Sequence, residues 1–162
     1  MVATKAAMAA ADATSNPPDP NDPSPAFRWR AGSLSLDRES TGLLADWLQS
    51  SHPQEACGLL IAALEGDTWR GHFTRAANEA SDPERSFRVP AQHVMHWDRE
   101  AQRSGRRILG HWHHHPGGEA QPSARDRAEL PEGWLGLVLA LGPGGLRWAC
   151  HGTPAETRVS GE

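Results

Sequence analysis

Positions 107–116 read Arg107-Ile108-Leu109-Gly110-His111-Trp112-His113-His114-His115-Pro116. Apolar residues open the stretch and predict a strand over 107–113, and Pro116 lacks the backbone donor that a sheet would need. Side chains at i and i+2 of a strand point to the same side, so His113 and His115 direct their imidazoles into one space and His114 points away. The stretch therefore predicts an imidazole pair at the end of a strand.

A carboxylate follows this pair along the chain. Asp126 stands eleven residues after His115, in the segment Pro122-Ser123-Ala124-Arg125-Asp126. Two imidazoles and one carboxylate suit Zn²⁺ and leave its fourth position to water, which is the arrangement of catalytic zinc sites. Water bound to such an ion has a pKa near about 7 and becomes a nucleophile. We therefore expect His113, His115 and Asp126 to be metal ligands.

Three other interpretations of these residues stay open. The chain has nine His, and four of them stand within positions 111–115, as in a surface tract that scavenges metal ions. Ser123 and Asp126 also have the spacing of a helix capping box, in which each side chain bonds to the backbone of the other residue. His111 lies two positions before His113 on the same strand, so it is a candidate fourth ligand.

Hydrolysis at a metal needs a base near the attacking water that is not itself a ligand. Glu55 is the candidate, because it stands where a predicted helix has ended and an apolar strand begins at Cys57. A charged side chain against a buried strand is costly unless it is paired or functional. The alternative for Glu55 is an exposed loop residue. We expect Cys57 to be a small buried residue rather than a ligand or nucleophile, since free Cys is among the most buried residue types.

Outward from these residues, the hydrophobic periodicity alternates between that of strands and that of helices. Asp37 is a predicted N-cap, Pro53 ends the first helix and Pro90 opens the second. The predicted strands are 33–36, 57–64, 69–75, 86–89, 107–113, 134–141 and 146–151; the predicted helices are 39–50, one that Pro90 opens, and 123–130. This order predicts an α+β fold, with helices packed on a sheet.

Composition limits the class of protein. The chain has 162 residues, which favours one domain; we expect a disordered Ala/Pro-rich tail over 1–25 and a folded domain over 26–162. The net charge of −4 argues against a nucleic-acid partner, and the apolar runs are too short for a membrane span, so a membrane is not an expected partner either. Two Cys cannot build a disulfide scaffold and the tail lacks the apolar core of a signal peptide, so we expect a cytoplasmic protein.

Three dispersed elements together resemble a known family. They are Glu55-Ala56-Cys57-Gly58-Leu59-Leu60, His113-His114-His115-Pro116 and Pro122-Ser123-Ala124-Arg125-Asp126. Their types and order resemble the JAMM (JAB/MPN) zinc metalloproteases, in the small stand-alone prokaryotic form. The resemblance covers about residues 33–151. It implies a curved mixed β-sheet flanked by helices, layered in the way of cytidine deaminases.

The resemblance also implies a role for each motif residue. The implied Zn²⁺ ligands are His113, His115 and Asp126. It implies that Glu55 is the general acid/base and that Ser123 helps to stabilise the oxyanion. The family commonly has Ser where this chain has His114, a residue that should point away from the metal.

Members of this family cleave peptide or isopeptide bonds at the C-terminus of ubiquitin-like proteins. The resemblance implies a zinc peptidase or isopeptidase that cuts after the Gly-Gly tail of a ubiquitin-like or sulfur-carrier (β-grasp) protein and releases cysteine or another conjugated amine. Two alternatives stay open: a catalytically silent scaffold that only binds partners, and a His-rich metal-binding protein. The sequence leaves the identity of the carrier and the oligomeric state open.

Overall fold

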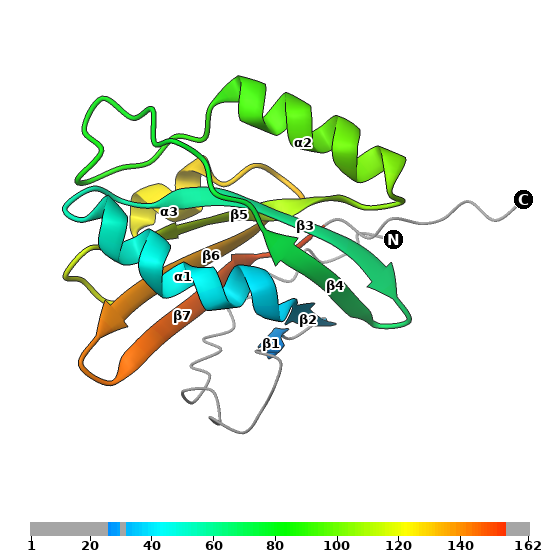
Figure 1. Ribbon diagram of the computed structural model, residues 1–162, viewed down its shortest axis with the longest axis horizontal. Helices are drawn as coiled ribbons and strands as arrows, with labels where there is room; N and C mark the ends of the chain where they lie inside the picture. The colour runs from blue at the N-terminus through cyan, green and yellow to red at the C-terminus, as the bar shows by residue number, and fades with distance from the viewer. Residues whose placement is uncertain (1–25, 30–31, 155–162) are drawn as a thin grey trace, which may run out of the picture.

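The computed structural model describes residues 26–29 and 32–154, so the predicted tail over 1–25 lies outside the described residues. Seven strands and three helices occupy this part of the chain (Figure 1). The strands are β1 (Ala26–Trp29), β2 (Gly32–Leu36), β3 (Cys57–Glu65), β4 (Thr68–Phe73), β5 (Arg107–His114), β6 (Leu135–Gly142) and β7 (Gly145–Gly152). The helices are α1 (Arg38–Ser51), α2 (Ala91–Arg103) and α3 (Ala124–Glu129). Among the described residues, no helix has the length and apolar character needed to span a lipid bilayer.

The described strands form one mixed sheet in the order β1-β2-β4-β3-β5-β6-β7. β2 pairs with β4 and β5 pairs with β6 in parallel, and the other neighbouring strands pair antiparallel. Figure 1 shows a curled sheet with α2 above it and α1 in front of it, and the two helices pack on opposite faces. The predicted α+β fold, a curved mixed sheet flanked by helices, is confirmed.

Strand β3 is buried on both faces because a helix covers each of them. Leu60 belongs to the core that contains Leu44 and Leu48 of α1. The next residues on either side, Leu59 and Ile61, point to the opposite face and pack with Ala101 of α2. This arrangement explains the unbroken apolar run from Cys57 onward, and it places β3 and β5 at the centre of the sheet.

The ends of the helices follow the local sequence. Asp37 Oδ1 accepts a hydrogen bond from the backbone N–H of Ser40 at 2.8 Å, so the predicted N-cap of α1 is confirmed. α1 ends at Ser51, two residues before Pro53, and α2 begins directly after Pro90. The short helix α3 has Ser123 as its N-cap, so the predicted capping box is also present.

One predicted strand is wrong. Residues 86–89 form no strand and belong to the connection between β4 and α2. The backbone N–H of Arg88 donates to Asn78 Oδ1 at 3.1 Å, and that of Ser86 donates to the carbonyl of Asp82 at 3.0 Å. Because a side-chain amide and a turn satisfy these donors, the segment needs no neighbouring strand.

Strand β1, which pairs antiparallel with β2, is not predicted from the sequence. Its residues, Ala-Phe-Arg-Trp, do not alternate strictly between apolar and polar types, so they lack the pattern that predicts the strand over 33–36. The remaining predicted elements are found with their ends shifted by one or two residues. The expected hairpin is confirmed, since β3 and β4 pair antiparallel across the turn at Gly66.

Candidate functional site

The end of β5 and the start of α3 bring the three predicted ligands together. The Nε2 atoms of His113 and His115 lie 3.1 Å apart. Asp126 Oδ1 lies 3.3 Å from Nε2 of His113, and Asp126 Oδ2 lies 3.3 Å from Nε2 of His115. Ligand atoms of these three residues all fall within 4.8 Å of one another. The predicted convergence of the two imidazoles and the carboxylate is therefore present in the fold.

This arrangement fits a zinc ion. Tetrahedral Zn²⁺ holds nitrogen and oxygen ligands at about 2.0–2.1 Å, which places neighbouring ligand atoms about 3.3 Å apart. The separations of 3.1 and 3.3 Å found here are close to that spacing. Two imidazole nitrogens and a carboxylate are the ligand types that zinc accepts, and three protein ligands leave one position open for water or substrate.

Hydrogen bonds outside the group orient two of its members. The backbone N–H of Ser123 donates to Asp126 Oδ2 at 2.7 Å, and that of Asp126 donates to Ser123 Oγ at 3.1 Å. The capping box thus aims the Asp126 carboxylate, so the two interpretations of this motif hold together. Nδ1 of His115 lies 3.0 Å from the carbonyl of Glu119. That carbonyl can only accept, so Nδ1 carries the proton and Nε2 keeps a lone pair directed at the group.

The charges in the group fit its role as a cation site. Burial acts to raise the pKa of Asp126, but hydrogen bonds with His113 and His115 outweigh it and hold that pKa well below its usual range. Burial lowers the pKa of His113, which is fully buried. The hydrogen bond with Asp126 raises the pKa of His115 against its partial burial. A carboxylate that stays ionised and a neutral buried imidazole are the protonation states that a metal requires.

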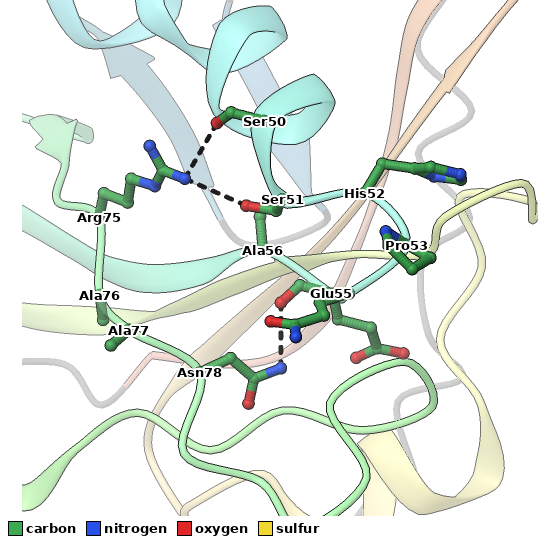
Figure 2. A pocket seen from close by; sticks show the side chains of 11 residues that line it. Ser50, Ser51, His52, Pro53, Glu55, Ala56, Arg75, Ala76, Ala77 and Asn78 are labelled. Atoms are coloured by element: carbon green, nitrogen blue, oxygen red, sulfur yellow. Dashed lines mark hydrogen bonds between the residues drawn. The ribbon is translucent and has the colours of Figure 1, made fainter.

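Glu55 is buried at the start of β3, with only 7 % of its surface exposed, so it is not an exposed loop residue. Its backbone N–H donates to the carbonyl of Pro83 at 2.7 Å, and its carbonyl accepts a hydrogen bond from Asn78 Nδ2 at 3.0 Å (Figure 2). Burial raises the pKa of Glu55 to about 7, although the neighbouring His115 acts in the opposite direction. A carboxyl group with such a pKa can both take up and release a proton near neutral pH.

One cavity joins Glu55 to the metal-binding group. It has a volume of about 250 Å³, and Glu55, His115, Ser123 and Asp126 all line it. His113 lies behind this cavity, where the ring of Phe87 stacks on its imidazole at 4.2 Å between centroids. The structure therefore gathers all five residues that the sequence predicts for the site.

A larger pocket, of about 610 Å³, adjoins Glu55 as well (Figure 2). The end of α1 and the segment 75–78 form its walls. Arg75 crosses this pocket and donates from one nitrogen to Ser50 Oγ at 3.0 Å and Ser51 Oγ at 3.2 Å. Glu55 lines both this pocket and the smaller cavity, so it stands at the boundary between them.

The two neighbouring histidines differ from the ligand pair. His114 points away from the metal-binding group, as predicted, and its Nδ1 accepts a hydrogen bond from the backbone N–H of Ala56 at 2.7 Å. His111 is not part of the three-residue group, so its candidacy as a fourth ligand finds no support among the described residues. Cys57 is fully buried and burial raises its pKa to about 12, which confirms a core role and makes it a poor nucleophile.

Residues 38–151 match the family model described as prokaryotic homologs of the JAB domain. The chain belongs to this family. A solved protein from Desulfitobacterium hafniense resembles this JAB domain with a TM-score of 0.62 and 20% identity, over 78% of this chain and 95% of that one. A JAB1/MPN domain protein from Archaeoglobus fulgidus covers 75% of this chain and 94% of its own, with 18% identity and a TM-score of 0.42. No curated protein matches the chain closely enough to count as a relative.

At 20% identity the Desulfitobacterium protein shows a likeness of fold alone, and the family match carries the assignment. The JAB/MPN family includes metalloisopeptidases, and its members often bind zinc. This JAB domain has a group of two His and one Asp in its fold that could hold such an ion.

Sequence reasoning missed several residues that shape the site. The Glu119 carbonyl and the Ala56 N–H that bonds to His114 are backbone groups, so no pattern of side chains predicts their role. His151 of β7 is buried near the metal-binding group without any motif around it. Only its position as a polar residue directly after the apolar residues 148–150 could have drawn attention to it.

Proposed function

We propose that this JAB domain is a zinc-dependent peptidase or isopeptidase. The observation that carries the proposal is the cavity shared by Glu55 and the metal-binding group. A scaffold that only binds partners has no use for a buried carboxyl group with a pKa of about 7 beside a converging His-His-Asp set. A surface metal buffer would not bury its ligands, whereas His113 is fully buried and His114 is turned away.

Glu55 acts as the general acid/base in this proposal. It accepts a proton from the attacking water and returns it to the leaving amine, for which a pKa near the working pH is suited. A zinc ion held by His113, His115 and Asp126 would activate that water and polarise the scissile carbonyl. The Glu55 backbone donates a hydrogen bond to the Pro83 carbonyl and accepts one from Asn78 Nδ2, and these two bonds fix the residue that carries the carboxyl group.

Ser123 stabilises the oxyanion in the same proposal. Its Oγ already accepts the backbone N–H of Asp126, so the hydroxyl proton is free to be donated to a developing negative charge. A donor of this kind, held in place before the reaction, contributes a few kcal/mol to stabilisation of the transition state. The capping box that holds Ser123 is therefore also what aims the donor.

The substrate we propose is a ubiquitin-like or sulfur-carrier protein with a Gly-Gly tail, cut after the second Gly to release cysteine or another amine. A cavity of about 250 Å³ suits an extended chain without side chains better than a bulky one. The larger pocket beyond Glu55 offers room for the leaving group, since Glu55 protonates the amine at their boundary. We propose a cytoplasmic location, consistent with Cys57 and Cys150 both being unpaired.

The test uses a panel of β-grasp carriers ending in Gly-Gly, each extended by one cysteine, and mass spectrometry of the products. Zinc-loaded protein should remove the extension, lose this activity with a chelator and regain it with added Zn²⁺. A carrier ending in Ala-Ala before the cysteine is the control and should be cut far more slowly. If the zinc-loaded protein cuts none of these carriers and no Gly-Gly-aminocoumarin peptide, the scaffold alternative replaces the peptidase.

A further inference from the structure

Three buried imidazole nitrogens near the metal-binding group have no hydrogen-bond partner among the described residues. They are Nδ1 of His111, Nδ1 of His113 and Nε2 of His151. The side chains are 8 %, 0 % and 3 % exposed respectively, so bulk water does not satisfy them. Buried polar groups are nearly always paired, and three unpaired ones in one region call for an explanation.

The sheet places these residues on one face, with Gly136 of β6 between His111 and His151. His111 of β5 is in register with Gly136 of β6, and Gly136 is in register with His151 of β7. Residues in register across neighbouring strands point to the same face, which is the face that carries His113. His113 lies two residues further along β5 than His111 and is in register with Val138 of β6.

Gly136 is what lets His151 approach. A Cβ at position 136 would lie 2.2 Å from Nε2 of His151 and 2.6 Å from its Cε1. The imidazole of His151 therefore lies against the backbone of β6 at Gly136, and its unpaired Nε2 lies over that strand. This contact also explains a glycine within the otherwise apolar, buried run of β6.

Two aromatic rings pack against His111 and His113. Phe87 stacks on His113 and meets His111 edge-on, with 5.0 Å between the centroids in the second contact. Trp134 also meets His111 edge-on, at 6.0 Å. Such walls exclude ions and bulk solvent and make each hydrogen bond inside them stronger.

The two ligand imidazoles differ in their outer hydrogen bonds. His115 has the Glu119 carbonyl at its Nδ1, which fixes the proton there and frees Nε2 for a metal. His113 presents the same Nε2 to the group, but its Nδ1 has no such acceptor among the described residues. Metal-bound histidines almost always donate their second N–H to an acceptor, which sets the tautomer and the ring orientation.

We propose that His151 and His111 are positioning residues for the metal centre, acting through one buried water among the three imidazoles. The water accepts the Nδ1 proton of His113 and donates its own two protons to Nδ1 of His111 and Nε2 of His151. Each of the three unpaired nitrogens then has a hydrogen-bond partner. A buried water usually has about three polar partners, as this one would. The bond keeps the Nε2 lone pair of His113 directed at the metal. The inference rests on the proposed role of His113 as a zinc ligand, but not on peptidase activity.

The test measures zinc affinity by competition with a chromophoric chelator. His151→Leu should weaken Zn²⁺ binding by about 10- to 100-fold, the usual effect of losing an outer hydrogen-bond partner. His151→Gln keeps a polar atom near the position of Nε2 and should retain most of the affinity. His72→Gln is the control, because His72 contacts Trp97 and Arg106 on another part of the sheet. Zinc binding that is lost in His113→Ala but present in wild type confirms the ligand role separately.

A second measurement keeps the proposal testable if His151→Leu does not fold. Nitrogen-15 NMR of the zinc-loaded wild type should show His113 protonated at Nδ1, with a slowly exchanging proton that is lost or shifted in His151→Gln. The proposal is overturned if His151→Leu lowers only the melting temperature of the metal-free protein and leaves the zinc affinity within about twofold. It is also overturned if wild type binds two ions and His151→Leu binds one, since His151 would then be a ligand.

Discussion

His114 connects β5, which carries the predicted ligands His113 and His115, to the segment that carries Glu55, the proposed base. Its Nδ1 accepts a hydrogen bond from the backbone N–H of Ala56 at 2.7 Å, and its own backbone N–H donates to the Ala56 carbonyl at 3.0 Å. Ala56 directly follows Glu55, and His114 stands between His113 and His115. The residue between the two predicted imidazole ligands therefore connects the two halves of the candidate site.

Replacing His114 with Ser should loosen that connection. His114→Ser leaves the Ala56 N–H without its buried acceptor, so the free energy of unfolding should fall by about 1–3 kcal/mol. The kcat on a carrier substrate should fall about 10-fold as Glu55 loses its alignment, while one zinc ion per chain stays bound. His96→Ser, at an exposed position on α2 away from both cavities, is the control. Unchanged kcat and unchanged stability would show that this connection is dispensable.

Acid should destabilise the metal-free protein through the same residue. Burial lowers the pKa of His114 from 6.5 to about 4, with His113 adding to the effect. Between these values the unfolded chain takes up a proton that the folded chain does not, so stability falls as pH falls from about 6.5 to 4 and is unaffected by this group above that window. His111 and His151 also have pKa values lowered to about 4 by burial, so they add to the acid loss in wild type and variant alike. In denaturant titrations with a chelator present, we expect wild type to lose about 1–3 kcal/mol more than His114→Ser over this window. If the free energy of unfolding of His114→Ser changed with pH in parallel with that of wild type, His114 would not be the cause of the acid loss.

Glu55→Gln distinguishes the three possible roles of Glu55. Glutamine has nearly the same volume but cannot accept the proton of the water, so zinc occupancy and melting temperature should stay close to wild type. Hydrolysis of a Gly-Gly carrier substrate should fall by about 10² to 10⁴. Loss of metal together with activity would instead make Glu55 a ligand. A wild-type rate with zinc still bound would remove Glu55 from the mechanism.

One zinc ion per chain is expected in protein purified without a histidine tag. The double variant His113→Ala with His115→Ala should lose it, because two of three ligands are gone. Elemental analysis measures the ratio, and His93→Ala with His96→Ala on α2 is a matched control that should keep the ion. An unchanged ratio in the ligand variant, or several weakly held ions in wild type, would favour the metal-buffer alternative.

Two glycine replacements should have opposite effects on stability. A Cβ at Gly58 would lie 1.7 Å from the carbonyl oxygen of Thr74 and 2.6 Å from Nε1 of Trp112, so Gly58→Ala should lose several kcal/mol or fail to fold. At Gly42, within α1, a Cβ meets nothing within 4 Å. Gly42→Ala should raise the free energy of unfolding by about 0.5–1 kcal/mol through helix propensity. Thermal and denaturant unfolding measure both, and a tolerated Gly58→Ala would show that the contact of β3 with Thr74 and Trp112 can relax.

Much of the fold follows from local sequence. The alternation that predicts strands and the helical spacing of apolar residues act within a few positions, and Asp37, Pro53, Pro90 and Ser123 end or begin helices by their own chemistry. The imidazole pair is equally local, because the two-residue period of a strand alone directs His113 and His115 into one space. The predicted strand over 86–89 is wrong because Asn78 and Asp82, several positions earlier, satisfy its backbone.

The sequence by itself determined the residue types of the site and the order in which they occur. Only the tertiary structure decided that Glu55 and Asp126, 71 positions apart, line one cavity, and that burial raises the pKa of Glu55 to about 7. It also decided that His151 lies over Gly136 behind the ligand pair. Strand pairing and burial bring together residues that are far apart in the chain. The pKa of a group depends on those neighbours and on its exclusion from water. A local sequence pattern therefore predicts neither which distant residues meet nor how their pKa values shift.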